Sequence, residues 1–261
     1  MTLSFVKPPE QPWINVLLYG PPKTGKTTGA CSVPGGVLLM NADLANAAWF
    51  AHSQDPEGRI SELDMTSPLQ ALIDVTNAIA EQPATEARMV NTVVLDPVGE
   101  LHRRMLEEAS NRAIRPTLNQ YGDTSTYIER FCRMLCDAPI NAVFVCHEQP
   151  VKDEASGGFE RLPYTGTTNP ALGQKLMGMV DVVGYTGVIE TANGKEYVAQ
   201  VINAQGRRGG DRFDVLDVGD GYRRLNLTEW FAAIHGAQTV EARTEKQIER
   251  EQDDLNRRQG K

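Results

Sequence analysis

Residues 20–28 have the types and spacing of a phosphate-binding loop. Their sequence, GPPKTGKTT, fits the pattern G-x-x-x-x-G-K-[ST] in full and follows an apolar run at residues 14–19. The glycines let the backbone bend around a polyphosphate so that N–H groups point inward, and the helix that follows adds its positive end. In such a loop Lys26 reaches the β- and γ-phosphates and Thr27 binds Mg²⁺. The expected nucleotide-binding residues are Gly20, Pro21, Pro22, Lys23, Thr24, Gly25, Lys26, Thr27 and Thr28.

A second stretch places a carboxylate where a metal ligand is needed. Residues 91–96 form a continuous apolar run that ends in Asp96. Continuous rather than alternating runs suit strands buried on both faces of a parallel sheet. An aspartate at the end of such a strand, downstream of a phosphate-binding loop, is the expected Walker B ligand that holds Mg²⁺. Thr27 and Asp96 are therefore the predicted metal-binding residues.

The group that orients the attacking water is not obvious from the Walker B segment. In many P-loop ATPases a glutamate directly follows the Walker B aspartate, but here Pro97 follows Asp96. The group that orients the attacking water must therefore come from a different part of the chain. A third apolar strand, residues 140–146, ends in His147 and Glu148. Polar residues at the carboxyl edge of a parallel sheet face the crevice where ligands bind, so His147 is a candidate sensor of the nucleotide; the alternative is a loop residue with a local partner.

The remaining elements position these residues. Strands that end at residues 19, 41, 95 and 146, each followed by a helical or polar segment, predict an α/β fold with a mostly parallel sheet and helices on both faces. A short strand is expected within 60–65, and an antiparallel C-terminal hairpin is expected between 180–186 and 195–203 through Asn193-Gly194. Predicted helices begin near Gly25 and cover 68–81, 97–112, 124–138, 171–179 and 229–235, the last capped by Thr228 and stopped by Gly236.

Three polar segments are predicted to lack regular structure. Residues 112–124 read as a solvated loop, and residues 150–170 as a long structureless stretch of the kind that is usually functional or disordered. Residues 205–212 form the most basic patch in the chain, held on glycines. Its alternative interpretation is a solvated turn.

Composition limits the class of protein. The chain has 261 residues, a net charge of -8 and four cysteines, Cys31, Cys132, Cys136 and Cys146, which read as reduced core thiols. The charge argues against a surface coated for nucleic-acid binding but allows local basic loops. No apolar run has the length of a membrane span and no signal-peptide layout is visible, which predicts a cytoplasmic protein. The expected organisation is an extended lead-in at 1–12, one domain at 13–236, and a charged tail at 237–261, either a solvated helix or disordered.

The order of these segments resembles the RecA-type recombinase ATPases. Residues 39–45 resemble the RecA segment in which the strand after the P-loop helix ends in the catalytic glutamate, and Asp43 falls on that glutamate. Residues 92–101 are similar to the RecA Walker B strand and its turn. Residues 143–147 look like the next core strand, whose polar end senses the γ-phosphate, and residues 150–172 resemble the DNA-binding loop and its exit. The size and order of the blocks fit the phage-encoded RecA-like proteins of the AAA_24 type, which include single-strand annealing proteins of the Sak group.

The resemblance implies a RecA-like P-loop NTPase core that uses ATP and Mg²⁺ and binds single-stranded DNA in phage recombination or strand annealing. It implies in-line attack of water on the γ-phosphate, with Lys26, Thr27 and Asp96 handling charge and Asp43 orienting the water. Glu100 and Glu148 are weaker candidates for that base. The implied DNA-loop residues are Lys152, Phe159, Arg161 and Tyr164. Candidates for DNA phosphate contacts or for completing a neighbouring subunit's site are Lys175, Arg207, Arg208 and Arg212.

Assembly and alternatives complete the expectations. An acidic protein with few basic loops binds DNA weakly as a monomer, so a homo-oligomeric ring or filament is expected to multiply the contacts. A single-strand binding protein is a further candidate partner. The main alternative is an annealing or partner-loading module in which ATP sets conformation with little hydrolysis. A P-loop kinase is a third alternative, but the sequence shows no clear arginine-rich lid or acceptor pocket.

Overall fold

The computed structural model describes most of the chain, namely residues 12–43, 46–81, 89–113, 115–152, 157–192, 194–216, 219 and 221–237. The predictions for the N-terminal lead-in before Pro12 and for the charged tail after Ala237 lie outside these residues. So does Asn193, the first residue of the predicted hairpin turn. Within the described part, no helix is both long and apolar enough to cross a bilayer.

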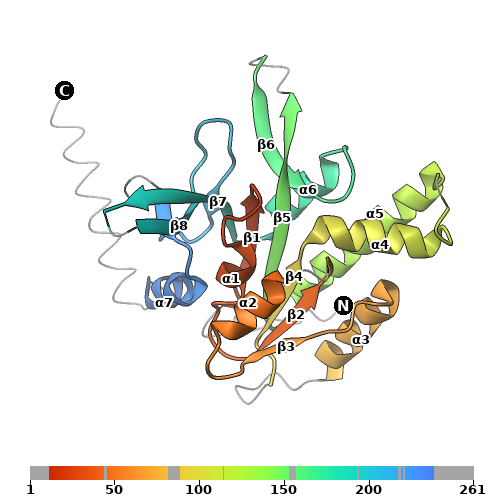
Figure 1. Cartoon of the computed structure of the whole chain (residues 1–261), viewed down its shortest axis with the longest axis horizontal. Helices are drawn as coiled ribbons and strands as arrows, with labels where there is room; N and C mark the ends of the chain where they lie inside the picture. The colour runs from red at the N-terminus through yellow and green to blue at the C-terminus, as the bar shows by residue number, and fades with distance from the viewer. Residues whose placement is uncertain are drawn as a thin grey trace, which may run out of the picture.

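Strands and helices alternate from β1 to α4 (Figure 1). The helices are α1 (Lys26–Ala30), α2 (Ala47–Ser53), α3 (Pro68–Glu81), α4 (Val98–Ala109), α5 (Leu118–Asp137), α6 (Ala171–Met179) and α7 (Leu227–Ala237). The strands are β1 (Asn15–Gly20), β2 (Val37–Asn41), β3 (Ile60–Glu62), β4 (Thr92–Asp96), β5 (Asn141–Lys152), β6 (Phe159–Tyr164), β7 (Val182–Thr191), β8 (Gly194–Gln200), β9 (Gly210–Asp211) and β10 (Tyr222–Arg224).

One mixed sheet runs through the molecule in the order β10-β8-β7-β1-β5-β4-β2-β3. The pairings from β7 through β1, β5, β4 and β2 to β3 are parallel, and β7 pairs with β8 in an antiparallel hairpin. Alternate residues of β1 enter two separate cores. Leu17 packs with α3 to α6 on one face, and Leu18 packs with α1, α2 and α7 on the other. The predicted α/β fold class, with helices on both faces and an antiparallel hairpin, is confirmed.

The register brings the ends of four strands to one edge. β5 lies between β1 and β4, so the P-loop strand and the Walker B strand are not neighbours. Gly20 is opposite His147 across the β1–β5 pair, and Asn41 is opposite Asp96 across the β2–β4 pair. Parallel strands bury both faces and leave their carboxyl ends free to carry polar groups. The candidate site residues therefore converge because of strand register.

Part of the segment expected to be structureless at 150–170 is instead an antiparallel arm, formed by residues 150–152 of β5 and by β6 at 159–164. β5 continues through Lys152, and β6 returns beside it with His147 opposite Tyr164. Buried Gln149 and Leu162 face the body of the protein. The arm projects beyond the other strands in Figure 1. Pro150 obscured this strand in the sequence, but a proline is tolerated where a strand has a neighbour on one side only.

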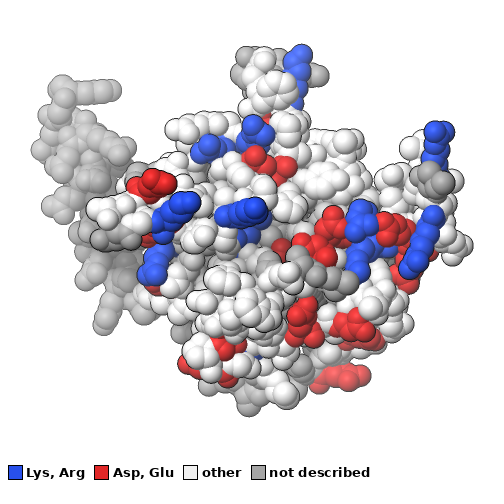
Figure 2. Space-filling view, in the orientation of Figure 1, with Lys and Arg blue, Asp and Glu red and all other residues white. Residues whose placement is uncertain are grey.

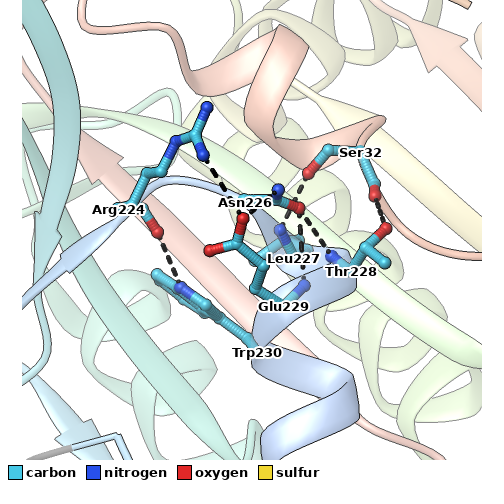
Figure 3. A network of polar contacts seen from close by, with 7 residues as sticks. All are labelled: Ser32, Arg224, Asn226, Leu227, Thr228, Glu229 and Trp230. Atoms are coloured by element: carbon cyan, nitrogen blue, oxygen red, sulfur yellow. Dashed lines mark hydrogen bonds and ion pairs between the residues drawn. The ribbon is translucent and has the colours of Figure 1, made fainter.

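Two helix starts were also wrong. α5 begins at Leu118, within the segment predicted as loop, because Thr117 and Gln120 form a reciprocal capping box. α7 begins at Leu227, so Thr228 is inside the helix and Gly236 does not stop it. The side-chain oxygen of Asn226 accepts hydrogen bonds from the backbone N–H groups of Thr228 and Glu229 instead (Figure 3).

The same region fastens α7 to the turn after α1. The hydroxyl of Thr228 donates to the backbone oxygen of Ser32, whose own hydroxyl accepts from the Leu227 N–H at 2.8 Å. The indole N–H of Trp230 donates to the Arg224 carbonyl at 2.8 Å. These contacts, drawn in Figure 3, hold the short segment between β10 and α7 against the P-loop helix. Leu225 in that segment consequently lies beside Gly29 of α1.

The four cysteines are free thiols. Cys31, Cys132 and Cys146 are buried, and burial raises the pKa of Cys31 to about 12. A thiol with so high a pKa stays protonated and poorly reactive. The prediction of reduced core thiols agrees with this packing.

His102 should make stability depend on pH. This residue of α4 is fully buried, its Nε2 lies 2.9 Å from the Ser125 hydroxyl, and burial lowers its pKa from 6.5 to about 4. Between pH 6.5 and pH 4 the His102 side chain is protonated in the unfolded chain but not in the folded chain. The free energy of unfolding therefore falls as the pH drops through this range. We expect a loss of about 3 kcal/mol between pH 7 and pH 4 from this residue.

The measurement is denaturant unfolding of the wild type and of His102→Gln across that pH range. Glutamine can keep a hydrogen bond to Ser125 but does not titrate, so the variant should lack this part of the pH dependence. Parallel pH curves for the two proteins would contradict the assignment.

Candidate nucleotide-binding site

The backbone of the phosphate-binding loop requires its two glycines. Gly20 and Gly25 have φ values of 149° and 76°, which favour glycine. A Cβ on Gly20 would lie 2.7 Å from the Thr186 carbonyl oxygen, and a Cβ on Gly25 would lie 2.9 Å from the Tyr197 ring. Neighbouring strands therefore press closely on the loop from one side and leave its other side open to a ligand.

Lys26 is held inside the loop. Its Nζ donates to the carbonyl oxygens of Gly20 at 3.1 Å and Pro21 at 2.5 Å, and the residue is only 7% exposed. Burial lowers the pKa of Lys26, while the nearby Asp96 carboxylate acts in the opposite direction. The Lys26 ammonium thus lies at the entrance of the loop and donates to backbone carbonyl oxygens. A charged phosphate oxygen is a stronger acceptor than these carbonyls.

Thr27 and Asp96 meet at the end of β4. The Thr27 side chain lies beside the Asp96 carboxylate, and both residues line the cavity at the loop. Burial raises the pKa of Asp96 to about 6, the nearby Asp43 adds to this, and Thr27 and Lys26 oppose it. A hydroxyl and a carboxylate side by side at a phosphate loop match the oxygen ligands that Mg²⁺ prefers. The predicted metal ligands therefore fit that ion.

A cavity of about 470 Å³ joins these groups. It contains most of the P-loop, and it also contains Asp43, Asp96 and His147, which the sequence placed on three different strands. The structure thus brings the predicted catalytic group together, with Glu100 as the exception. The lining residues are Pro22, Lys23, Gly25, Lys26, Thr27, Thr28, Gly29, Asp43, Phe50, Asp96, Pro97, His147, Tyr197 and Leu225.

The three candidate bases have different surroundings. Asp43 is exposed at the cavity wall just after β2. Glu100, in the first turn of α4, is outside the cavity lining and pairs with Arg103 at 2.7 Å. Glu148 accepts a 2.6 Å hydrogen bond from the Tyr185 hydroxyl and does not line the cavity. The geometry favours Asp43 among the three.

His147 lines the same cavity from the end of the parallel part of β5. Desolvation lowers the pKa of His147, and the positive charge of Lys26 lowers it further. At neutral pH the ring is therefore an uncharged hydrogen-bonding group. This suits a sensor that contacts a phosphate oxygen through a neutral N–H.

The apolar end of the cavity was missed in the sequence. Tyr197 of β8, Phe50 of α2 and Leu225 line it beyond the P-loop helix. Tyr197 is 47% exposed and Phe50 is 50% exposed, so both rings are accessible to a ligand. The expected strand at 195–203 contained Tyr197, but nothing in its alternation marked one side as facing the P-loop. A helical or polar segment was expected after the strand that ends at residue 41, but the bounds of α2 were not predicted.

The predicted basic residues lie outside this cavity, and most have acidic partners. Arg161 lies 3.6 Å from Glu148, and Arg212 lies 2.7 Å from Asp181. The remaining pairs are Arg208 with Glu160 at 2.5 Å and Lys175 with Glu129 at 2.7 Å. The Arg207 guanidinium lies over the Tyr185 ring at 4.7 Å. Salt bridges at exposed sites are weak and can be exchanged for other anions.

The other predicted DNA-loop residues lie along the arm. Lys152 and Phe159 are opposite each other near its tip, and Phe159 is 68% exposed. Tyr164, at the base of β6, packs against the position of Gly99 in α4. The Lys152 and Phe159 side chains therefore lie on the outside of the arm, and the Tyr164 side chain packs against the body of the protein. Figure 2 shows lysine and arginine side chains on the arm and on the surface below it.

A second cavity of about 630 Å³ lies between α5, α6 and the loop that follows β6. Its lining is rich in hydroxyl groups. Of the α5 residues in that wall, Leu118, Tyr121 and Gly122 fall in the segment predicted as loop, and the rest fall in the predicted helix. Of the predicted residues it contains Tyr164 and Lys175. The other lining residues are Leu118, Tyr121, Gly122, Ser125, Thr126, Glu129, Gly166, Thr167, Thr168, Asn169, Ala171 and Leu172.

Comparisons with known proteins place most of the chain in one family. The family model AAA_24, described as an AAA domain, matches residues 13–213. No significant match was found among curated protein sequences. A KaiC-like protein from the hyperthermophilic archaeon Pyrococcus horikoshii is 13% identical with a TM-score of 0.42, over 81% of this chain and 88% of that one. A prototypical ATPase from the type III secretion system of pathogenic bacteria is 12% identical with a TM-score of 0.43, over 67% of this chain and 51% of that one.

The position of Asp43 generates a test of the base. We expect Asp43→Asn to lower kcat for ATP by about 100-fold, because a lost general base typically has at least this effect. Nucleotide affinity should be retained, because the P-loop contacts are unchanged. The measurements are phosphate release and the Kd of a fluorescent nucleotide. Glu100→Gln is the matched control and should keep near wild-type turnover. An active Asp43→Asn beside an inactive Glu100→Gln would reverse the assignment.

The aromatic end of the cavity generates a second test. We expect Tyr197→Ala to raise the Kd of ATP about tenfold, since stacking of a base on an aromatic ring contributes about 1–3 kcal/mol. Tyr197→Phe should bind ATP normally. Inorganic tripolyphosphate, which has no base, should compete equally well in all three proteins. Equal loss of tripolyphosphate and ATP affinity would show that the substitution damages the P-loop instead.

Proposed function

We propose that this chain, which belongs to the AAA_24 family of AAA domains, is a magnesium-dependent ATPase that binds single-stranded DNA and serves phage recombination or strand annealing. The observation that supports hydrolysis best is the single cavity that joins the P-loop, the Thr27–Asp96 contact, Asp43 and His147. A simple nucleotide-binding turn would not require carboxylates from two further strands at the same place.

Each residue has a distinct task in the proposed reaction. Backbone N–H groups of the loop and the Lys26 ammonium bind the phosphates and stabilise the charge that develops on them. Asp43 accepts a hydrogen bond from the attacking water and orients it in line with the leaving group. His147 contacts the γ-phosphate as an uncharged donor. Thr27 and Asp96 would hold Mg²⁺, which would neutralise part of the phosphate charge.

The nucleobase would occupy the apolar end of the cavity. Tyr197 and Phe50 offer ring faces there, and Leu225 offers an aliphatic surface. Aromatic rings bind bases through stacking, which every base permits. ATP is the proposed substrate because of the family resemblance rather than because of a hydrogen-bond pattern at this end.

Single-stranded DNA would follow the arm and the second cavity. Binding of single strands combines a positively charged surface with aromatic platforms. The arm supplies Lys152 and Phe159 near its tip, and the cavity between α5 and α6 supplies Tyr121, Tyr164 and Lys175. Loop hydroxyls at Thr167 and Thr168 can donate to phosphate oxygens. The two features adjoin because β6 leads directly into the cavity loop.

Assembly is part of the proposal. A protein of net charge -8 with most of these cations already paired needs several subunits on one strand to bind firmly. In a ring or filament, Arg207, Arg208, Arg212 or Lys175 would either contact DNA phosphates or complete a neighbouring nucleotide site. A single-strand binding protein is a candidate partner that would present the DNA.

Turnover of ATP with and without single-stranded DNA tests this function. We expect DNA to stimulate phosphate release by the wild type, and we expect Lys26→Ala to release none. The double substitution of Lys152 and Phe159 by alanine, and Tyr121→Ala in the second cavity, should each weaken DNA binding, about tenfold for a lost stacking partner. Tyr127→Ala is the matched control, because Tyr127 is on the same helix but outside that cavity.

The outcomes separate the candidate functions. Turnover that ignores DNA, with no gel shift, would contradict the recombination function and leave an ATPase with another client. DNA binding that requires ATP but proceeds without turnover, unaffected by Asp43→Asn, would favour the conformational or partner-loading module.

A further inference from the structure

A compact group of side chains joins the P-loop strand to the base of the arm. Tyr19 and Tyr185 are buried on the adjacent strands β1 and β7, with ring centroids 5.2 Å apart in an edge-to-face arrangement. Glu148 and Arg161 lie on the two strands of the arm where the arm leaves the sheet. We call these four residues, together with Arg207, the arm-base cluster. None of its members lines the nucleotide cavity.

Tyr19 fixes one end of the cluster. It directly precedes Gly20, the first residue of the P-loop, and is fully buried. Its hydroxyl donates to the Arg208 carbonyl at 2.7 Å and accepts from the Arg208 N–H at 2.8 Å. The Arg161 carbonyl of the arm is 3.2 Å away. The strand that carries the P-loop is thus bonded to the segment that supports the arm.

Tyr185 and Glu148 form the other link. The Tyr185 hydroxyl donates a 2.6 Å hydrogen bond to Glu148, and Arg161 lies 3.6 Å from the same carboxylate. The Arg207 guanidinium covers the Tyr185 ring. Glu148 directly follows His147, and successive side chains of a strand point to opposite faces. The Glu148 carboxylate therefore holds β5 from the face of the sheet opposite the nucleotide cavity, one residue after His147, which lines the cavity.

A short segment closes the cluster on the outer side of β6. The Arg161 N–H donates to the Gly206 carbonyl at 2.7 Å, and Arg208 pairs with Glu160 through two hydrogen bonds of 2.5 and 2.9 Å. Gly206 and Arg208 therefore support the arm, and the predicted role of the 205–212 patch in DNA contact stays a prediction. A movement of the arm must strain or break these bonds.

We propose that Tyr185 and Glu148 are positioning residues that couple the nucleotide cavity to the arm. The Tyr185–Glu148 hydrogen bond holds β5 at the point where the sensor strand becomes the arm. A nucleotide that draws His147 toward its phosphates also moves Glu148, the next residue on the same strand, and the cluster transmits that movement to β6. Glu148 on this basis is not a base for hydrolysis. The coupling requires nucleotide binding but does not require DNA.

Hydrogen exchange of the arm, measured by mass spectrometry without nucleotide and with Mg²⁺ and a β,γ-imido ATP analogue, tests the coupling. In the wild type we expect the analogue to change exchange across residues 148–163. In Tyr185→Phe we expect faster exchange of the arm, about tenfold for a lost hydrogen bond to a charged group, and no further response to the analogue. Its Kd for the analogue should stay near the wild-type value, because Tyr185 is outside the cavity.

Two further variants separate positioning from general damage. Glu148→Gln keeps an oxygen that accepts from Tyr185 and should retain both turnover and the arm response. Arg207→Gln removes only the cation over the Tyr185 ring and leaves the core unchanged. It should weaken the response of arm exchange to the analogue, as Tyr185→Phe does. Tyr222→Phe is the matched control, because it removes a hydroxyl from β10 of the same sheet, far from the arm in strand order.

The outcomes decide the proposal. An arm in the wild type that does not respond to the analogue would overturn it, and so would a normal response in Tyr185→Phe. Loss of turnover in Glu148→Gln with a normal arm response would make Glu148 catalytic and would also overturn it. If the analogue does not bind the wild type, the proposed ATPase function fails as well, whereas a failure confined to the exchange data leaves that function standing.

Discussion

The parallel pairing of β1 with β5 is the constraint on which the site depends. It sets Gly20 opposite His147, and the pairing of β5 with β4 then brings Asp96 to the same edge. A shift of one residue would turn every side chain of the strand to the other face. The buried apolar residues on both faces of these strands prevent such a shift. Core packing therefore positions the residues of the nucleotide cavity, without requiring direct contacts between them.

Two opposite charges in this buried place explain the local electrostatics. Burial lowers the pKa of Lys26 and raises that of Asp96, so each group alone is shifted toward its neutral form. Each also counters the shift of the other through their attraction. In the proposed function, a nucleotide bound with Mg²⁺ would supply an anion beside Lys26 and a cation beside Asp96. The two charges are costly to bury, and a ligand that brings both partners recovers the cost.

The sequence predicted the parts of the fold that depend on short-range pattern. The P-loop, the continuous apolar strands and Asp96 have local signatures, and the structure places them together. The arm could not be predicted in the same way, because Pro150 and the glycines after it lower the strand signal while the pairing with β6 is set by tertiary contacts. The same holds for Tyr197 and Phe50, whose place in the cavity follows from sheet order. The start of α5 was readable, since Thr117 and Gln120 have capping-box spacing.

The paired cations lead to a different view of how this protein meets a polyanion. Arg161, Arg208, Arg212 and Lys175 appear in the sequence as available positive charge, but in the structure each has a carboxylate within 4 Å. On the proposed function, a DNA phosphate would have to displace a carboxylate, and the net gain per contact would be smaller than for an unpaired cation. Displacement at Arg161 or Arg208 would also release Glu148 or Glu160 at the base of the arm. If the proposed coupling holds, binding of an anion there would loosen the contacts that tie the arm to the P-loop strand and would change the nucleotide cavity through the same ion pairs.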